Sequence, residues 1–171
     1  YNSAYGRYPG AAHAHFLFPS FYYHYEGTFE VKVCTSRDNL RWFRPTRETL
    51  VPLGEPGEFD CFIISIAPGF VPVDDDHYAL YYRSGDGPHG GSAFDLSVED
   101  RAKTASRVSR AVLKRDRIVG IEAGADGGHF CTRPLLWSGD RLELNVEPLG
   151  PDARLRVQLL DWENEEPVKI F

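Results

Sequence analysis

The chain has 171 residues; 42% of them are hydrophobic and 26% are charged, and 19 Lys and Arg against 25 Asp and Glu give a formal net charge of −6. This is the composition of an ordinary globular protein, and it excludes collagen-like, disordered and coiled-coil chains. No apolar run approaches the ~18–20 residues of a membrane-spanning helix, and no charged segment followed by an apolar one indicates a signal peptide. Because the sequence contains no methionine, even at position 1, we interpret it as the remainder of a longer protein.

The first half of the chain is predicted to form short strands. Residues 29–35 alternate between apolar and polar side chains, which is typical of a half-buried strand. The turns between the predicted strands are rich in Pro, Gly and Asp, and the twelve prolines argue against long helices. Residues 98–108 are the only stretch with helical character. Three further β-type runs are 62–66, 70–73 and 78–83.

Strict alternation also marks residues 141–147 and 154–160 in the second half. Further strand candidates are 108–113, 118–123 and 130–135. Short strands with turn signals between them are typical of an antiparallel β-sandwich, which we predict here. A register slip of one residue would expose the whole apolar set. We therefore expect six side chains to be buried together: Leu142, Leu144, Val146, Leu155, Val157 and Leu159.

A change in composition divides the chain. All nine Tyr lie between Tyr1 and Tyr82. Residues 1–100 hold 7 basic and 14 acidic residues, whereas residues 101–171 hold 12 basic and 11 acidic ones. The sequence therefore predicts two domains, 1–100 and 101–171, in an all-β protein.

Two segments are interpreted as structural turns. In residues 36–42 (SRDNLRW) we expect Asp38 to accept backbone N–H groups within its own turn, and Trp42 to pack on the neighbouring strand. Residues 74–76 are three consecutive Asp. They are predicted to form a hairpin tip and not a calcium loop, because the alternating ligand spacing of such a loop is absent.

No metal or cofactor site is predicted. His13 and His15 share one face of a strand, but no third ligand is near them in the sequence. The basic cluster in residues 101–117 is interpreted as a solvated strand face, because the aromatic residues lie elsewhere; we expect no nucleic-acid and no membrane partner. The three cysteines are too far apart for a zinc site: Cys34, Cys61 and Cys131.

The order of several motifs resembles a known family. The chain is similar to the late blades of the five-bladed β-propellers of glycoside hydrolase families 32 and 43 and their relatives, in which an SRDG-x-x-W-x-R turn, a P-x-G-x-x-G-x-x-D segment and a YY strand with a later His follow in this order. The tail, from RAVLKRDRIVGIEAG to RLRVQLLD, is similar to the β-sandwich that follows such propellers. The resemblance covers about residues 13–171. Its segments here begin at His15 and continue through TSRDNLRW, RPTRETLVPLGEPGEFD and YALYYRSGDGPH.

The resemblance implies an incomplete propeller. A blade takes ~40–50 residues, so the first half holds about two blades and cannot close a five-bladed ring. Glycosidases of this type use paired carboxylates, but the chain has no NDPNG-like, RDP or EC motif. We therefore expect a fragment that lacks the catalytic first blades, with further chain segments completing the propeller. Whether the whole protein is an enzyme stays open, as does its compartment.

The same resemblance gives the candidate saccharide-binding residues. It places Asp60 at the start of a strand facing the central funnel, and Asp86 and His89 on a loop that borders the funnel. His24 and Tyr22, before the first predicted strand, add a stacking and hydrogen-bonding edge. We expect Asp60, Asp86 and His89 to converge at one end of the first half around a concave polar opening. From the residues alone, a turn cap is the favoured interpretation of Asp60, and the loop after Tyr82 is equally well a solvated connection.

Three functions follow from these expectations. The leading one is a glycoside-hydrolase-like protein that acts on or binds a saccharide. The second is a non-catalytic carbohydrate-binding module, which the absent acid and base motifs favour. The third is a structural or interaction β-sandwich.

Overall fold

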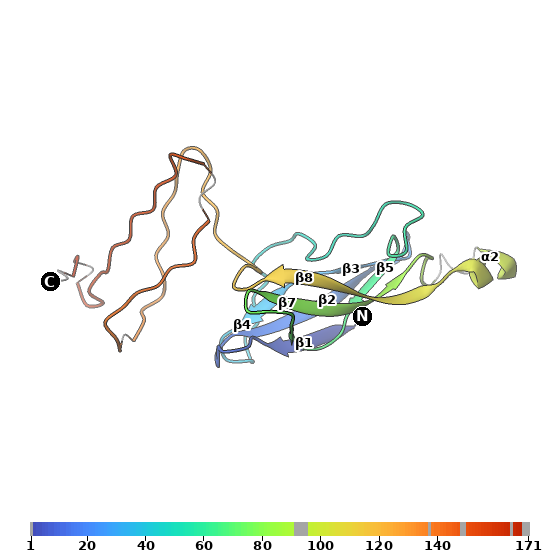
Figure 1. Cartoon of the computed structure of the whole chain (residues 1–171), viewed down its shortest axis with the longest axis horizontal. Helices are drawn as coiled ribbons and strands as arrows, with labels where there is room; N and C mark the ends of the chain where they lie inside the picture. Colours follow the sequence, from blue (N-terminus) through green and yellow to red (C-terminus); the bar gives the residue numbers. More distant parts are fainter. Residues whose placement is uncertain (1, 91–95, 137, 148–149, 165, 169–171) are drawn as a thin grey trace. The chain divides into compact units, whose positions relative to one another are not determined.

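A computed structural model describes residues 2–90, 96–136, 138–147, 150–164 and 166–168 of the chain (Figure 1). The chain divides into two compact units, Tyr1–Gly120 and Ile121–Phe171, which are described separately. The first unit contains one curled, mixed sheet of eight strands that forms a half-barrel. Its elements are β1 (Ser3–Arg7), β2 (His15–Tyr23), β3 (Thr28–Val31), β4 (Cys34–Ser36), β5 (Ile63–Ile66), β6 (Val71–Pro72), β7 (His77–Gly85), α2 (Val98–Lys103) and β8 (Ser106–Lys114).

The strands of the sheet follow the order β1-β2-β3-β5-β7-β6, while β4 also pairs with β2 and β8 also pairs with β7. Every strand pair is antiparallel except β3 with β5, whose parallel contact is Phe29 opposite Ile63. A parallel pair needs a crossover of a dozen or more residues. Residues 37–62 supply it, and they are tied to β3 where the Leu50 N–H donates to the Val31 carbonyl at 2.8 Å.

The curl of the sheet brings β1 back to the segment that follows β5. The Asn2 side-chain amide donates to Ser65 Oγ at 2.8 Å, and the Gly69 N–H donates to the Tyr5 carbonyl at 3.1 Å. Tyr8, just beyond β1, accepts the Asp116 N–H at 2.7 Å through its phenol oxygen. Burial is the main cause that raises the pKa of Tyr8 to about 12. One open side of the half-barrel is therefore partly closed at β1.

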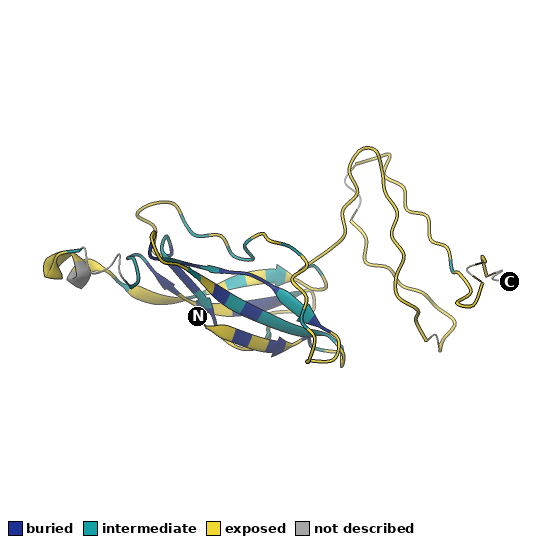
Figure 2. Ribbon diagram, turned by 180° about the vertical axis from the view of Figure 1, so that it is seen from behind, coloured by how far each residue is buried: buried dark blue, intermediate teal, exposed yellow. Residues whose placement is uncertain are grey.

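Buried and more exposed residues alternate along strands of the sheet (Figure 2). Because successive side chains of a strand point to opposite faces, the core lies on one face of this sheet. Its fully buried apolar members come from β2, β3, β5 and β7 and from Val33, between β3 and β4. Phe70 and Phe16 pack against them, with ring centroids 5.5 Å apart in an edge-to-face arrangement. The fully buried apolar side chains are Phe18, Val31, Val33, Ile64, Ile66 and Leu80.

A buried cation sits between β3 and β4. The Lys32 ammonium donates to Glu30 Oε2 at 2.6 Å and to Thr49 Oγ1 at 2.8 Å, and Thr49 Oγ1 donates to the same carboxylate at 2.9 Å. Burial alone would raise the pKa of Glu30, but the hydrogen bonds from Lys32 and Thr49 and the Lys32 charge outweigh it and hold the pKa below its ordinary value. The network thus anchors the crossover segment to β3.

Both turn predictions are confirmed. Asp38 Oδ1 accepts the N–H groups of Arg41 and Leu40 at 2.8 and 2.9 Å, and these two bonds are the main cause that lowers the pKa of Asp38 to about 2. Trp42 is half-buried with its ring edge-to-face against Tyr5 of β1, 6.5 Å between centroids. Residues 74–76 form the tip between β6 and β7, because the Val73 N–H donates to the His77 carbonyl at 3.0 Å.

The prediction of a mostly β protein is confirmed: the runs at 62–66 and 70–73 contain β5 and β6, and the runs at 78–83 and 108–113 lie within β7 and β8. The helix is shorter than expected, and residues 106–108 belong to a strand instead. The expectation that Tyr22 precedes the first strand is wrong, because Tyr22 lies in β2. Neither propeller blades nor a sandwich is identified in the described residues. The sheet extends past residue 100, since β8 pairs with β7 along its whole length.

The expected burial in the second unit is wrong. Between residues 121 and 168 the described residues form no strand ladder, only the isolated bridge of Leu160 with Pro167. The alternating segments are extended, but no second layer of described residues covers them within this unit (Figures 1 and 2). Leu159 is half-buried. The other five side chains are 44–57% exposed: Leu142, Leu144, Val146, Leu155 and Val157.

Leu80→Ala tests the core assignment. Leu80 is fully buried, so the substitution is expected to lower the free energy of unfolding by about 2–5 kcal/mol through lost burial and the cavity it leaves. The matched control is Leu40→Ala, whose side chain is 84% exposed, with an expected change within about 0.5 kcal/mol. Urea denaturation of the full chain measures both. Equal effects would contradict the placement of Leu80.

Glu30→Gln tests the buried network through pH. Because the pKa of Glu30 is lowered on folding, its contribution to stability is fully present above its ordinary value of 4.5 and is lost as the pH falls through the folded-state pKa. The variant is therefore expected to be destabilised relative to the native chain at neutral pH, with the difference shrinking as the pH falls below the ordinary value of 4.5. Urea midpoints across pH measure it. Glu48→Gln, at an exposed position, is the control, and a difference independent of pH would refute the network.

Candidate functional site

Strand pairing brings all five candidate residues to one end of the sheet. In the ladders, Tyr22 stands opposite Phe29, Phe29 beside Ile63, and Ile63 opposite Gly85. The ends of β2 and β7 therefore lie beside the starts of β3, β5 and β8. We call this the His89 end of the sheet. The candidates adjoin it in sequence: Tyr22 and His24 at the end of β2, Asp60 before β5, and Asp86 and His89 after β7.

His89 is held by the turn between β2 and β3. Its N–H donates to the Gly27 carbonyl at 2.8 Å, and its carbonyl accepts the Tyr22 phenol at 2.9 Å. The imidazole lies on Phe29, with ring centroids 4.8 Å apart, and edge-to-face against Tyr22 at 5.6 Å. The loop after β7 is therefore fixed by both its backbone and its ring.

The ring contacts continue outward from Tyr22. The His24 ring is edge-to-face against Tyr22 at 5.8 Å, and its Nδ1 lies 3.4 Å from the Tyr22 phenol oxygen. Tyr25 follows, 5.8 Å from His24. Exposure rises along this series from Phe29, which is 4% exposed, to Tyr25, which is 92% exposed. We call these five side chains the ring series: Phe29, His89, Tyr22, His24 and Tyr25.

Asp60 is buried and has a structural partner. Its Oδ2 accepts the Tyr82 phenol of β7 at 3.1 Å. Burial first, and then the Asp60 carboxylate, raise the pKa of Tyr82. The other oxygen, Oδ1, lies so close to Gly54 that a Cβ there would collide with it. This carboxylate therefore joins the end of the crossover segment to the core.

Asp86 connects β7 to β8. Its Oδ1 accepts the Ala105 N–H at 2.6 Å, and its Oδ2 pairs with the Arg107 guanidinium at 3.3 Å. The carbonyl of Asp86 lies 4.0 Å from Cys61 Sγ, beside Asp60 in sequence. The two carboxylates thus occur at the same end of the sheet, and each is bound to its own local partner.

Three of the five predicted site residues contact one another in the structure. The concave polar opening expected between Asp60, Asp86 and His89 stays a prediction. Tyr22, His24 and His89 are in ring contact, whereas Asp60 and Asp86 bind elsewhere. Two of the hollows on the described residues measure about 420 Å³ over residues 7–12 and about 400 Å³ over residues 19–22. Of the five candidates, only Tyr22 lines one of them.

The sequence interpretation missed Phe29 and Tyr25. Phe29 was assigned only to a strand, although its inward position makes it the platform for His89. The available signal was the density of rings in residues 21–25, FYYHY, which ends a strand and enters a turn. A cluster of aromatic residues at a strand end is a stronger pointer to a surface of rings than any one of its members.

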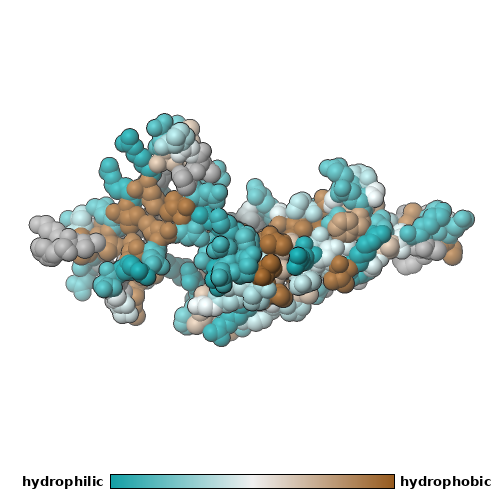
Figure 3. Space-filling model, in the orientation of Figure 1, coloured by the Kyte–Doolittle hydropathy of each residue, from teal (hydrophilic) through white to brown (hydrophobic). Residues whose placement is uncertain are grey.

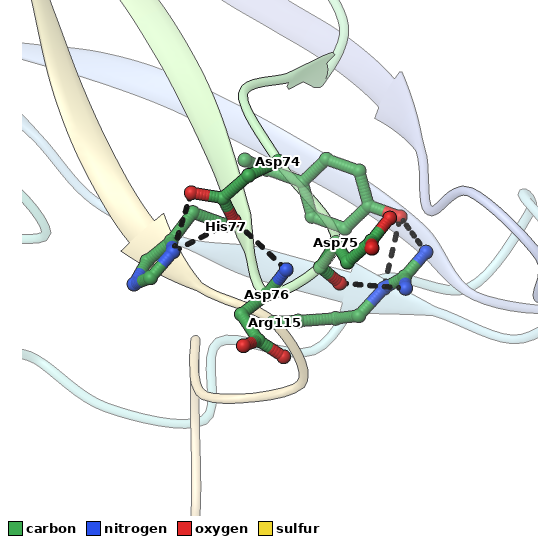
Figure 4. Close-up of polar contacts among 6 residues, drawn as sticks. Asp74, Asp75, Asp76, His77 and Arg115 are labelled. Atoms are coloured by element: carbon green, nitrogen blue, oxygen red, sulfur yellow. Dashed lines mark hydrogen bonds and ion pairs between the residues drawn. The ribbon is translucent and has the colours of Figure 1, made fainter.

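The acidic hairpin tip satisfies its own groups (Figure 4). Asp74 Oδ1 accepts the Asp76 N–H at 2.8 Å and contacts His77 Nδ1 at 2.9 Å, and the His77 contact is the main cause that lowers the pKa of Asp74. Arg115 donates to the Tyr78 phenol at 2.7 Å and to the Asp75 carbonyl at 2.9 Å. Among the described residues, no group of three or more His, Cys, Asp or Glu could hold a metal ion.

Within the part of the chain that the structure describes, no helix combines the length and apolar character needed to cross a membrane. Comparisons with protein-family models, with curated proteins and with solved structures find no match to this chain.

Tyr82→Phe tests the anchoring of Asp60. The substitution leaves a buried carboxylate without its phenol donor, which is expected to cost about 1–3 kcal/mol of unfolding free energy. Tyr81→Phe is the matched control, because Tyr81 is 39% exposed on the other face of the same strand; its expected effect is within about 0.5 kcal/mol. Denaturant titration of both variants decides, and a stable Tyr82→Phe chain would show that the bond is dispensable.

Proposed function

We propose that this chain binds a saccharide at the His89 end of the sheet. The observation that carries the proposal is the ring series, which runs from the buried Phe29 to the exposed Tyr25 at the end where Asp60 and Asp86 also stand. The resemblance to glycoside hydrolase propellers gives the same ligand class to three members of the series, Tyr22, His24 and His89, and to Asp60 and Asp86 beside them.

The chemistry of the ring series suits a sugar. Aromatic faces pack on the apolar C–H faces of sugar rings, while imidazole and phenol groups exchange hydrogen bonds with hydroxyls. His24 and Tyr25 are the exposed members and supply the contact surface. Tyr22 and His89 support them, since the phenol of Tyr22 is bonded to the His89 carbonyl.

Binding is favoured over catalysis on these residues. A glycosidase needs two carboxylates facing one glycosidic bond. Here Asp60 is buried against Tyr82, and Asp86 is bonded to Ala105 and Arg107. The enzyme interpretation therefore requires acid and base groups outside this chain, on first blades that the resemblance implies.

The proposal includes the finer architecture. Residues 1–100 would be late blades of an incomplete propeller, and residues 101–171 its trailing antiparallel sandwich. The antiparallel ladder of β5 with β7 is compatible with blade strands. The exposed alternating side chains of residues 141–157 support a sandwich, because a second layer would cover them.

A structural or interaction module is the second candidate. It is favoured by the apolar surface of the second unit, which is visible as brown side chains in Figure 3. Contiguous exposed apolar surface marks interaction sites. Apolar side chains of this unit that are more than half exposed include Ile121, Phe130, Leu135, Leu136 and Leu144.

His24→Ala and Tyr25→Ala test the saccharide proposal. Titration calorimetry of the full chain against a panel of neutral pentose and hexose oligosaccharides should give one class that binds. Each variant should weaken that binding by roughly tenfold, or about 1.4 kcal/mol, with an unchanged thermal midpoint. His13→Ala, an exposed histidine of the turn between β1 and β2, is the control and should bind as the native chain does. Absence of binding to the whole panel, or an equal loss in the control, would reject the proposal.

A further inference from the structure

Strand β8 forms one edge of the sheet. It pairs with β7 over nine residues, from His77 opposite Lys114 to Gly85 opposite Ser106. Both β5 and β6 pair with the other side of β7. Figure 1 shows β8 beside β7, leading from α2. In the described residues no strand pairs with the outer side of β8.

The ladder shows which backbone groups face outward. The Ala67 N–H donates to the Tyr81 carbonyl, so Tyr81 turns its backbone groups toward β5, and its neighbours turn theirs toward β8. The Asp86 N–H accordingly donates to the Ala105 carbonyl in the same register. Residues 107, 109, 111 and 113 therefore bond to β7. The N–H and C=O groups of Val108, Arg110 and Val112 point away from the sheet, without a partner among the described residues.

The edge at β1, unlike the edge at β8, is covered by contacts with other segments. At β1 the Tyr5 carbonyl accepts the Gly69 N–H, and the Asn2 side chain bonds to Ser65 and Ile66. These contacts occupy the outer side of β1. The outer side of β8 carries no comparable contact in the described residues, although its length exceeds the usual short edge strand of a protein that avoids pairing.

The side chains beside this edge combine apolar and basic groups. Val108 is 79% and Val112 50% exposed, and Arg110 lies between them on the same face. Tyr81 of β7 stands opposite Arg110 and is 39% exposed. The other face of β8 is used for packing, because Ala111 and Leu113 lie against the core. An added strand would thus find valine contacts and a guanidinium beside its backbone bonds.

The charge of β8 selects the kind of strand. It contains Arg107, Arg110 and Lys114 and no acidic residue. Arg107 is paired with Asp86. Arg110 and Lys114 are the other two charged residues of β8. Antiparallel pairing of two copies in full overlap would set Arg110 opposite its own copy, and like charges directly opposite destabilise a sheet. An acidic strand would instead place carboxylates opposite these basic residues, and opposite charges across a strand pair stabilise a sheet.

We propose that the β8 edge is a docking site for an extended acidic peptide segment of a partner protein. The segment adds to the sheet as its next strand and bonds to the backbone of Val108, Arg110 and Val112. Its carboxylates lie beside Arg110 and Lys114, and its apolar side chains lie on the two valines. Backbone bonds supply affinity and the charges supply selection, as in other cases of strand addition.

The experiment uses the full chain and a fluorescein-labelled peptide that alternates glutamate with valine and matches β8 in length. Fluorescence anisotropy is expected to show binding at least roughly tenfold tighter than that of the same peptide with lysine in place of glutamate. Arg110→Glu should reverse this preference. Hydrogen exchange should slow at the amides of Val108, Arg110 and Val112 on binding and stay unchanged at Ser109 and Ala111.

Val112→Pro isolates the backbone contribution. Its N–H faces outward, so proline removes a docking donor without removing a ladder bond, which is the position where edge strands tolerate proline. We expect at least a roughly tenfold loss of peptide affinity, while the control Val112→Thr, which keeps the N–H, binds within about twofold of the native chain. Should circular dichroism show Val112→Pro unfolded, Val108→Pro and the exchange pattern take its place.

Four results would overturn the proposal. They are absence of peptide binding, equal binding of the glutamate and lysine peptides, a proline variant that binds as the native chain does, and protection of all amides alike. A short DNA duplex that displaces the peptide and binds the proline variant unchanged would make β8 a polyanion surface instead. A concentration-dependent dimer that Val112→Pro abolishes would assign the edge to a second copy.

Discussion

The parallel contact between β3 and β5 is the constraint on which the rest of the sheet depends. It joins two antiparallel halves, one built on β2 and the other on β7, through the single register pair of Phe29 and Ile63. The Phe29 N–H donates to the Phe62 carbonyl at 2.8 Å, and the Phe62 N–H donates to the Gly85 carbonyl at 3.1 Å. Val31 and Ile64 are fully buried beside this junction. The core draws on both halves across this junction, since Phe18 and Val31 come from one half and Ile64 and Leu80 from the other.

The same junction positions the candidate site. The His89 ring packs on the buried Phe29, and the bond from Phe62 fixes Gly85, the last residue of β7 before Asp86 and His89. A residue that couples the two halves of a fold therefore also sets the geometry of the ring series. Substitutions at Phe29 would change stability and ligand contact together, which is why the functional test uses His24 and Tyr25, outside the junction.

Local pattern predicted local structure well and long-range contacts poorly. The turn at Asp38 follows from residues next to one another, and β7 and β8 follow from short runs of β-forming residues. By contrast, β2 is nearly continuous in apolar residues and has no period that marks its inner face. The hydrogen-bond partner of Asp60 is Tyr82, 22 residues away in the sequence. No local spacing rule could therefore show whether Asp60 binds a sugar or anchors the crossover segment to the core.

The second unit shows why alternation alone does not bury a strand. In β8 one face is packed because β7 supplies a full ladder and the core supplies a second layer, on which Ala111 and Leu113 lie. Leu144 and Val157 have the same alternation but neither support among the described residues, and both stay about half exposed. Alternation selects which side chains share a face, whereas burial needs a separate surface to cover that face. The two conditions come from different parts of a sequence, and only the first can be read within one segment.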